Sequence, residues 1–235
     1  MKNAGLFIDG FNLYHAIDEL GLNYLKWTDL WRIGEEIIPS KTERLACVEF
    51  CTAYFPGDHG KRIRHDAYVG ALTLKGVAFH WGHYADDHRD CPSCKHSWVR
   101  PNEKQTDINV ALSVFDAARR DRIDHAYLLS ADSDQAATVS WFKAAFPDKE
   151  ITIVIPPARP GSKLIRDKRE RKKIQLNRDH FERAHMGSMV TDGSHTINRP
   201  FEYNPPIGWV HPDDQPKQKP PKPPKKGAWS KGVKG

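Results

Sequence analysis

Strand-like and helix-like segments alternate along this chain, and the alternation constrains the fold more than any other feature of the sequence. Short apolar runs rich in branched and aromatic residues are followed by segments whose apolar residues recur at helical spacing. We expect strands at residues 3–9, 44–55, 77–84, 124–130, 150–157 and 173–176. We expect helices at residues 11–20, 28–38, 56–76, 104–120 and 133–146, with a basic helix and a final helix between residues 158 and 186. Such alternation predicts an α/β fold with a central, mostly parallel sheet and helices on both faces.

The expected elements fill one domain with appendages. A chain of 235 residues is long enough for one α/β domain and short for two of equal size. We place this domain at residues 1–186, interrupted by a polar, turn-rich insertion at residues 85–103. Residues 187–211 are expected to form an ordered extension, and the Pro- and Lys-rich residues 212–235 a disordered tail. The apolar anchors of the extension are predicted to be Phe201, Tyr203, Ile207 and Trp209.

The composition indicates a folded protein without a membrane partner. With 39% hydrophobic residues and seven tryptophans the chain can bury a core, and no apolar run approaches the ~18 residues that span a bilayer. The start, MKNAGLFIDG, has no apolar stretch long enough for a signal peptide, so we expect a cytoplasmic location. Cys47 and Cys51 are expected on one face of a strand about 13 Å apart at ~3.3 Å per residue, which is too far for a disulfide.

The net charge of +6 is unevenly distributed. Residues 163–183 carry nine Lys and Arg against four Asp and Glu, and residues 212–235 carry seven Lys against two Asp, so that the rest of the chain is acidic at −4. Basic segments on an acidic body suit a polyanionic partner, because Lys and Arg release counter-ions from phosphates. The alternative is that these segments are solvated, solubilising surfaces.

Four aspartates stand where expected strands end or expected helices begin. Asp9 follows the apolar run LFI, and Asp132 and Asp134 follow AYLLS in the same way. Asp107 lies in the first turn of a helix, whereas Asp116, nine residues on, falls on the opposite side of that helix and is expected to form a surface ion pair with Arg119 or Arg120. Clustered carboxylates repel one another and suit Mg²⁺ or Mn²⁺, metals that commonly serve phosphate chemistry. The alternative for Asp107 and Asp134 is a helix-capping role.

Three sequence blocks resemble the signature blocks of the NYN domain, a LabA-like member of the PIN-like nuclease superfamily. The blocks are LFIDGFNLY, EKQTDINVAL and LLSADSDQAATVSWFKAAFP, and the resemblance covers roughly residues 4–186. NRPFEYNPPIGW is similar to a segment that follows the domain in a bacterial subgroup. Ala131, where the family commonly has Gly, and Gln135, where it usually has an apolar residue, depart from the pattern.

The resemblance implies a PIN-like Rossmannoid three-layer sandwich and a Mg²⁺- or Mn²⁺-dependent endoribonuclease. It further implies RNA as the partner and a homodimer, since PIN-like domains are often dimeric. The residues that match the family's metal-binding carboxylates are Asp9, Asp107 and Asp132, with Asp134 at a further acidic position. Asn12 matches the residue that supports the first aspartate, and Ser130 matches the serine that opens the last block. A metal-activated water would then hydrolyse the phosphodiester without a covalent intermediate.

Other functions remain compatible with these residues. Lys104, one helical turn before Asp107, could bind substrate phosphate or pair with a neighbouring carboxylate. A noncatalytic RNA- or protein-binding module would use the same cleft, although clustered negative charge does not suit a surface that only binds phosphates. A metal-dependent phosphatase is a second alternative; the haloacid dehalogenase type requires a second Asp where Phe11 stands.

The insertion combines cysteines, histidines and aromatic residues. Cys91 and Cys94 form a C-x-x-C pair, and with His83 and His88 they would give the four ligands of a structural Zn²⁺. His80 and His96 lie nearby in the sequence. The alternative is a reduced or redox-labile thiol pair in a loop. The rings of Trp81, Tyr84 and Trp98 are expected either to stack on unpaired bases or to pack the insertion onto the domain.

Overall fold

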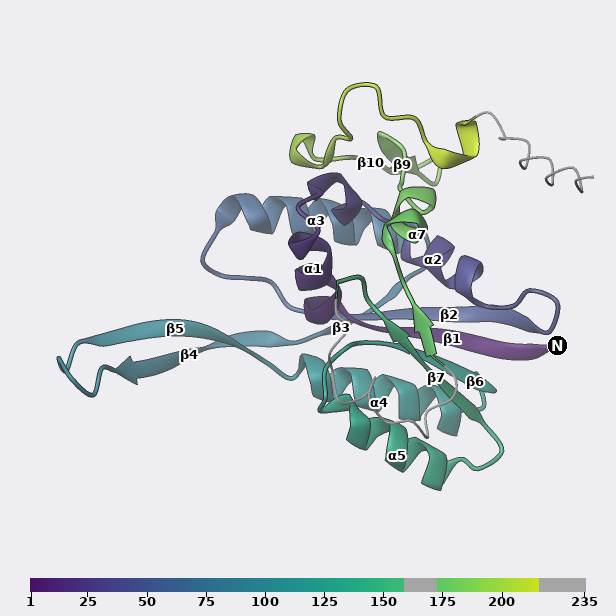
Figure 1. Ribbon diagram of the computed structural model, residues 1–235, viewed down its shortest axis with the longest axis horizontal. Helices are drawn as coiled ribbons and strands as arrows, with labels where there is room; N and C mark the ends of the chain where they lie inside the picture. Colours follow the sequence, from purple (N-terminus) through teal and green to yellow (C-terminus); the bar gives the residue numbers. More distant parts are fainter. Residues whose placement is uncertain (159–172, 216–235) are drawn as a thin grey trace, which may run out of the picture.

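The computed structural model describes residues 1–158 and 173–215, and its central feature is a six-stranded sheet (Figure 1). The strands lie in the order β3-β2-β1-β6-β7-β8, and every pairing between neighbours is parallel. Their bounds are β1 Lys2–Asp9, β2 Glu43–Thr52, β3 Ala78–Trp81, β6 His125–Leu129, β7 Glu150–Ile155 and β8 Lys173–Gln175. The α/β architecture predicted from the alternation is confirmed.

Helices cover both faces of this sheet and give a three-layer sandwich (Figure 1). One face carries α1 Gly10–Glu19, α2 Leu30–Ile37, α3 His59–Leu74 and α7 Arg178–Arg183, and the other carries α4 Thr106–Arg119 and α5 Gln135–Ala145. Successive residues of β1 supply the two cores: Leu6 and Ile8 pack on the first side and Phe7 on the second. Burial on both faces explains why the strand is a continuous apolar run. Among the described residues, no helix is both long and apolar enough to cross a membrane.

The strand order places a crevice at the carboxyl ends of β1 and β6. From β1 the chain proceeds to β2 and β3 on one side, and it later returns to β6, β7 and β8 on the other side. In open parallel sheets, ligands bind outside the carboxyl ends of strands at this kind of reversal. Asp9 ends β1, and the segment carrying Asp132 follows β6.

The insertion is a β-hairpin rather than an irregular loop. β4 (His83–Asp90) and β5 (Ser97–Lys104) pair in antiparallel fashion only with each other, and they extend away from the body (Figure 1). The expected strand 77–84 is therefore two elements, separated at Gly82. A Cβ at Gly82 would lie 2.7 Å from the carbonyl oxygen of Lys104, so the close approach of the two hairpin ends requires glycine here.

Cys47 and Cys51 lie on β2, and both contact the α4–α5 side of the sheet as free thiols. The shared face predicted for them is confirmed. Burial raises the pKa of Cys47 to about 11 and that of Cys51 to about 12, so both stay protonated at neutral pH.

The C-terminal extension is anchored by fewer residues than expected. β9 (Met189–Thr191) and β10 (Thr196–Asn198) form an antiparallel pair, and Tyr203 and Trp209 pack against the core as predicted. Phe201 and Ile207 are 84% and 107% exposed, so the assignment of these two residues as anchors was wrong. Phe201 shares the short 3₁₀ helix η2 (Phe201–Tyr203) with Tyr203, and only the latter ring faces the domain.

The expectation of disorder from residue 212 onward is wrong for its first residues. Pro212–Asp214 form the 3₁₀ helix η3, and Arg32 Nη2 on α2 donates to Asp213 Oδ2 at 3.3 Å. This contact ties the start of the tail to the domain. The basic helix expected beyond residue 158 falls largely in residues 159–172, which lie outside the described residues together with 216–235. A further 3₁₀ helix, η1 (Asn23–Lys26), connects α1 to α2.

Candidate active site

Asp9 ends β1 and caps α1 from a buried position. Its side chain is 2% exposed; Oδ1 accepts a hydrogen bond from Asn12 N at 2.9 Å, and Oδ2 accepts one from Ser130 Oγ at 2.9 Å. The first bond satisfies a free N–H at the helix start, and the second connects β1 to the end of β6. A Cβ at Gly10 would lie 2.5 Å from the carbonyl oxygen of Cys51, so only glycine permits the chain to turn here beside β2.

The segment after β6 is hydrogen-bonded to the same region. Asp132 N donates to Ser130 Oγ at 3.0 Å, and Ala131 N donates to Asn12 Oδ1 at 3.0 Å. Asp134 N donates to Asp132 Oδ1 at 2.9 Å. Asn12 and Ser130 therefore hold the Asp132 segment beside the end of β1, and Ala131 keeps its N–H satisfied in place of the glycine common in the resembled family.

Asp107 reaches this region from a third element, the first turn of α4. Gln135 opens α5 and is 2% exposed; its Nε2 donates to the carbonyl oxygen of Asp107 at 3.2 Å, and its Oε1 accepts from Thr138 Oγ1 at 2.8 Å. The polar residue that departs from the family pattern therefore connects the first turns of α4 and α5.

Repulsion and burial make this cluster unfavourable in the absence of a counter-ion. Burial, followed by repulsion from Asp107 and Asp132, raises the pKa of Asp9 to about 6. Burial, followed by repulsion from Asp132, Glu103 and Asp134, raises the pKa of Asp107 above its usual range. Carboxylates whose pKa values rise in this way gain from a nearby cation, because it stabilises their charged forms.

Asp9, Asp107 and Asp132 line one cavity of about 1150 Å³. Its lining also includes a set of cations, which we call the basic lining: Lys26, Lys61, Arg64 and Arg100. Aromatic rings share the cavity, and Tyr84 of the hairpin lies 5.9 Å from Phe11 and 5.4 Å from Phe55 between ring centroids. Of the three insertion aromatics, Tyr84 thus lies at the candidate site.

Two predicted site residues lie outside this cavity. Among the described residues that line it, neither Asp134 nor Lys104 is present. Lys104 is the last residue of β5, not part of α4, and its side chain is exposed. The exclusion of Asp116 is consistent with the structure, since Arg119 and Arg120 bind its carboxylate at 2.9 and 2.8 Å.

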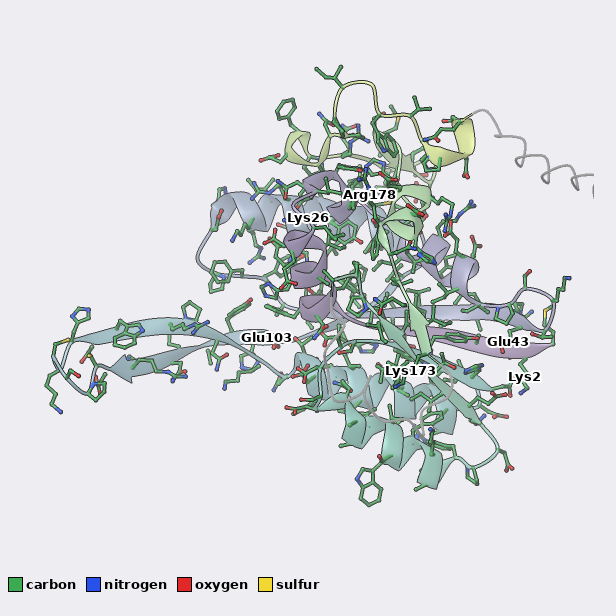
Figure 2. The ribbon with its side chains drawn as sticks, in the orientation of Figure 1. Lys2, Lys26, Glu43, Glu103, Lys173 and Arg178 are labelled. Atoms are coloured by element: carbon green, nitrogen blue, oxygen red, sulfur yellow. The ribbon has the colours of Figure 1, made fainter. Side chains whose placement is uncertain are left out.

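Sequence reasoning did not identify the basic lining or Glu103. Glu103 lies where the hairpin meets the body (Figure 2), and its neighbourhood depends on the hairpin geometry. Part of the basic lining could have been predicted from residue spacing in the sequence. Lys61 and Arg64 lie three residues apart in α3 and therefore share one helix face.

The donor set suits Mg²⁺ or Mn²⁺, although the side chains are not gathered around an ion. Asp9, Asp107 and Asp132 offer hard carboxylate oxygens, and each Asp9 oxygen keeps a lone pair beyond the hydrogen bond that it accepts. Within residues 1–158 and 173–215, no three His, Cys, Asp or Glu side chains lie close enough to hold a metal ion. Binding would require Asp107 and Asp132 to turn toward Asp9.

The hairpin does not bring the four expected zinc ligands together. His83 pairs with Lys104 at the base, eight residues and about 26 Å along the strand from Cys91 at the tip. His88 is an odd number of residues from Cys91, so it points to the other face of the hairpin. The described geometry therefore does not gather Cys91, Cys94, His83 and His88 around one point within a single chain.

The remaining insertion aromatics pack against protein. Trp81 stacks on Tyr54 at 4.6 Å between ring centroids, with the planes 15° apart. Trp98, on the hairpin, stacks on His96 at 6.3 Å. The contact of Trp81 matches the packing alternative, whereas Trp98 is 44% exposed and its stacking partner belongs to the hairpin rather than to the domain.

No family model matches the sequence, and no curated protein matches it. Among solved structures, this chain is similar to a protein of unknown function from Vibrio parahaemolyticus. The two are 16% identical, the match covers 75% of this chain and 94% of that one, and the TM-score is 0.46. Because the function of that protein is itself unknown, the similarity assigns no activity to this chain.

Proposed function

We propose that this protein is a metal-dependent ribonuclease that hydrolyses RNA phosphodiester bonds at Asp9, Asp107 and Asp132. The observation that carries the proposal is that three carboxylates from three elements line one cavity together with the basic lining. The resemblance to NYN domains supports the same residues. A carboxylate cluster alone would repel RNA, so the proposal requires both a bound cation and basic side chains.

Each residue has a distinct part in this function. Asp9, Asp107 and Asp132 would hold Mg²⁺ or Mn²⁺, which when bound supplies an activated water and stabilises negative charge on the phosphate. Asn12 and Ser130 fix the relative positions of the strand ends through the hydrogen bonds described above. Lys61 and Arg100 neutralise phosphates of the strand in the cavity.

The test is cleavage of labelled RNA and DNA in the presence of Mg²⁺, Mn²⁺ or EDTA. We expect RNA cleavage that EDTA abolishes and that Asp132→Asn lowers by at least about 10²-fold, since the variant loses a carboxylate at the reacting phosphate. Asp116→Asn is the matched control, because this carboxylate pairs with arginines away from the cavity. Cleavage by Asp132→Asn at the wild-type rate, with both variants folded, would exclude the assignment.

A noncatalytic RNA-binding module is the second candidate, favoured by the basic lining and by the absence of a gathered metal-ligand group among the described residues. It predicts RNA binding that EDTA does not alter and no cleavage under any metal. A metal-dependent phosphatase would instead release phosphate from a small aryl phosphate while leaving RNA intact.

A further inference from the structure

The tip of the β4–β5 hairpin presents two free cysteines far from the candidate active site. Cys91 directly follows β4, and Cys94 lies in the turn before β5. Cys94 is exposed, and the tip is the part of the hairpin most distant from the body (Figure 1). Neither residue belongs to the two core clusters, so a packing role does not account for the pair.

Backbone hydrogen bonds close the turn that carries the two cysteines. Cys91 N donates to the carbonyl oxygen of His96 at 2.8 Å, Lys95 N donates to that of Cys91 at 2.9 Å, and Lys95 has a left-handed φ of 59°. These contacts hold the C-x-x-C turn in a defined backbone conformation, so that Cys91 and Cys94 are presented together at the tip.

The chemistry of the pair selects Zn²⁺ over the hard cations suited to the aspartates. Two thiolates separated by two residues are a common half of a tetrahedral zinc site, whereas Mg²⁺ and Mn²⁺ prefer oxygen. A closed structural site requires four ligands. The C-x-x-C turn supplies two of them.

The described residues of a single chain do not supply the other two. His83 lies at the hairpin base, and His88 points to the opposite face. His96 is the cross-strand neighbour of Cys91, but its ring lies nearly parallel to that of Trp98, with 14° between the planes. In the part of the chain that the structure describes, no three metal-binding side chains are grouped.

We propose that two copies of this protein meet at their hairpin tips and share one Zn²⁺ bound by Cys91 and Cys94 of each copy. The four thiols lose their protons to solvent as the four Zn–S bonds form, leaving a site with two excess negative charges. Lys95 of each copy places a positive charge beside it. The protruding hairpin lets the two tips meet while the bodies stay apart (Figure 1). This inference is independent of the proposed nuclease activity.

The first test measures metal and mass together on the full chain, purified with a phosphine reductant and without chelator. We expect one zinc ion per two chains and a dimer by light scattering, converted to monomer by a zinc chelator and restored by added Zn²⁺. Cobalt in place of zinc should give the intense visible absorption of a tetrahedral thiolate site. One zinc per monomer, a zinc-free protein, or a dimer that the chelator leaves intact would each overturn the proposal.

The second test uses variants in the turn. Cys91→Ser and Cys94→Ser should lose zinc and dimer formation together, while Ser93→Ala, in the same turn but without a ligand atom, should keep both. His96→Ala should also keep both; zinc loss in this variant would show that the chain completes the site by itself. Thermal unfolding checks that each variant is folded. A dimer that only the reductant dissociates is a disulfide and would contradict the shared ion.

Discussion

At the scale of single residues, Gln135 shows how a polar side chain can occupy a buried position. Its Nε2 donates to the carbonyl oxygen of Asp107 and its Oε1 accepts from the hydroxyl of Thr138, so these two partners satisfy the buried amide of Gln135. Because the first of these belongs to a candidate metal ligand, Gln135 contributes to the position of Asp107.

Gln135→Met should therefore reduce both stability and cleavage. The side-chain volume is similar, but the two hydrogen bonds are lost, and we expect a loss of about 1–3 kcal/mol in the free energy of unfolding. Denaturant unfolding and RNA cleavage measure the two effects. Ser133→Ala, an exposed neighbour, is the control. A variant that matches the wild type in both measurements would mean that Gln135 does not hold Asp107.

His185 predicts a pH dependence of stability. It is 6% exposed, its Nε2 has no hydrogen-bond partner among the described residues, and burial lowers its pKa from 6.5 to about 4. In the unfolded chain the His185 side chain becomes protonated below pH 6.5, whereas in the folded chain it becomes protonated only below about pH 4. The free energy of unfolding therefore falls as the pH falls from 6.5 to about 4.

His185→Phe should flatten this dependence. The difference in unfolding free energy between variant and wild type should shift in favour of the variant from pH 7 to pH 4, because phenylalanine keeps a ring in the site and takes up no proton. Thermal or urea unfolding across this range measures the difference. Substitution of the exposed His195 by Phe is the control and should leave the pH dependence of the unfolding free energy as in the wild type. If His185→Phe also shows the wild-type pH dependence, protonation of His185 does not cause it.

At the scale of elements, the hairpin is separable from the fold that carries it. β4 and β5 pair only with each other, and Asp87 lies directly opposite Arg100. Replacing residues 88–99 by Asn-Gly would close the shortened strands with a two-residue turn. We expect the midpoint of thermal unfolding to stay within about 2 °C and RNA cleavage to persist, with zinc binding lost. Loss of cooperative unfolding would show that the tip supports the body.

The sequence predicted the strands that lie in the core, and it missed the hairpin strands, which do not. β1, β6 and β7 were readable because both faces are buried, which leaves continuous apolar runs. The hairpin strand HYADDHRD has no buried residue and hence no apolar period. Asp9 and Asp132 followed from strand ends, whereas Glu103 and the basic lining depend on where the hairpin and α3 lie in space.

At the scale of the whole molecule, one cavity is lined both by the cluster of aspartates and by the basic lining. On the proposed function, the basic side chains dominate the encounter with RNA, and binding should weaken as salt is added. Lys61 is the most suitable residue for testing this. Its Nζ lies 5.5 Å from the centroid of the Phe55 ring, and none of the salt bridges among the described residues involves its side chain.

Lys61→Gln should reduce the salt dependence of RNA binding. Measured on an Asp132→Asn background to prevent cleavage, the slope of log affinity against log salt should fall in magnitude by about 0.7 for one lost contact with a single strand. Lys149→Gln is the control, because Lys149 pairs with Asp121 near the amino end of β7. If the slope of log affinity against log salt is the same for the Lys61 variant and its parent, Lys61 does not contact the bound RNA.

The two outermost strands of the central sheet are its shortest, with four residues in β3 and three in β8. Exposed strand edges offer unpaired N–H and C=O groups to other chains, and short edges offer few. Copies of this protein are therefore poorly equipped to join their sheets into a continuous ribbon, even at high concentration. If two copies associate through their hairpins as proposed, the short edge strands would still disfavour fibres that grow by pairing of the central sheets.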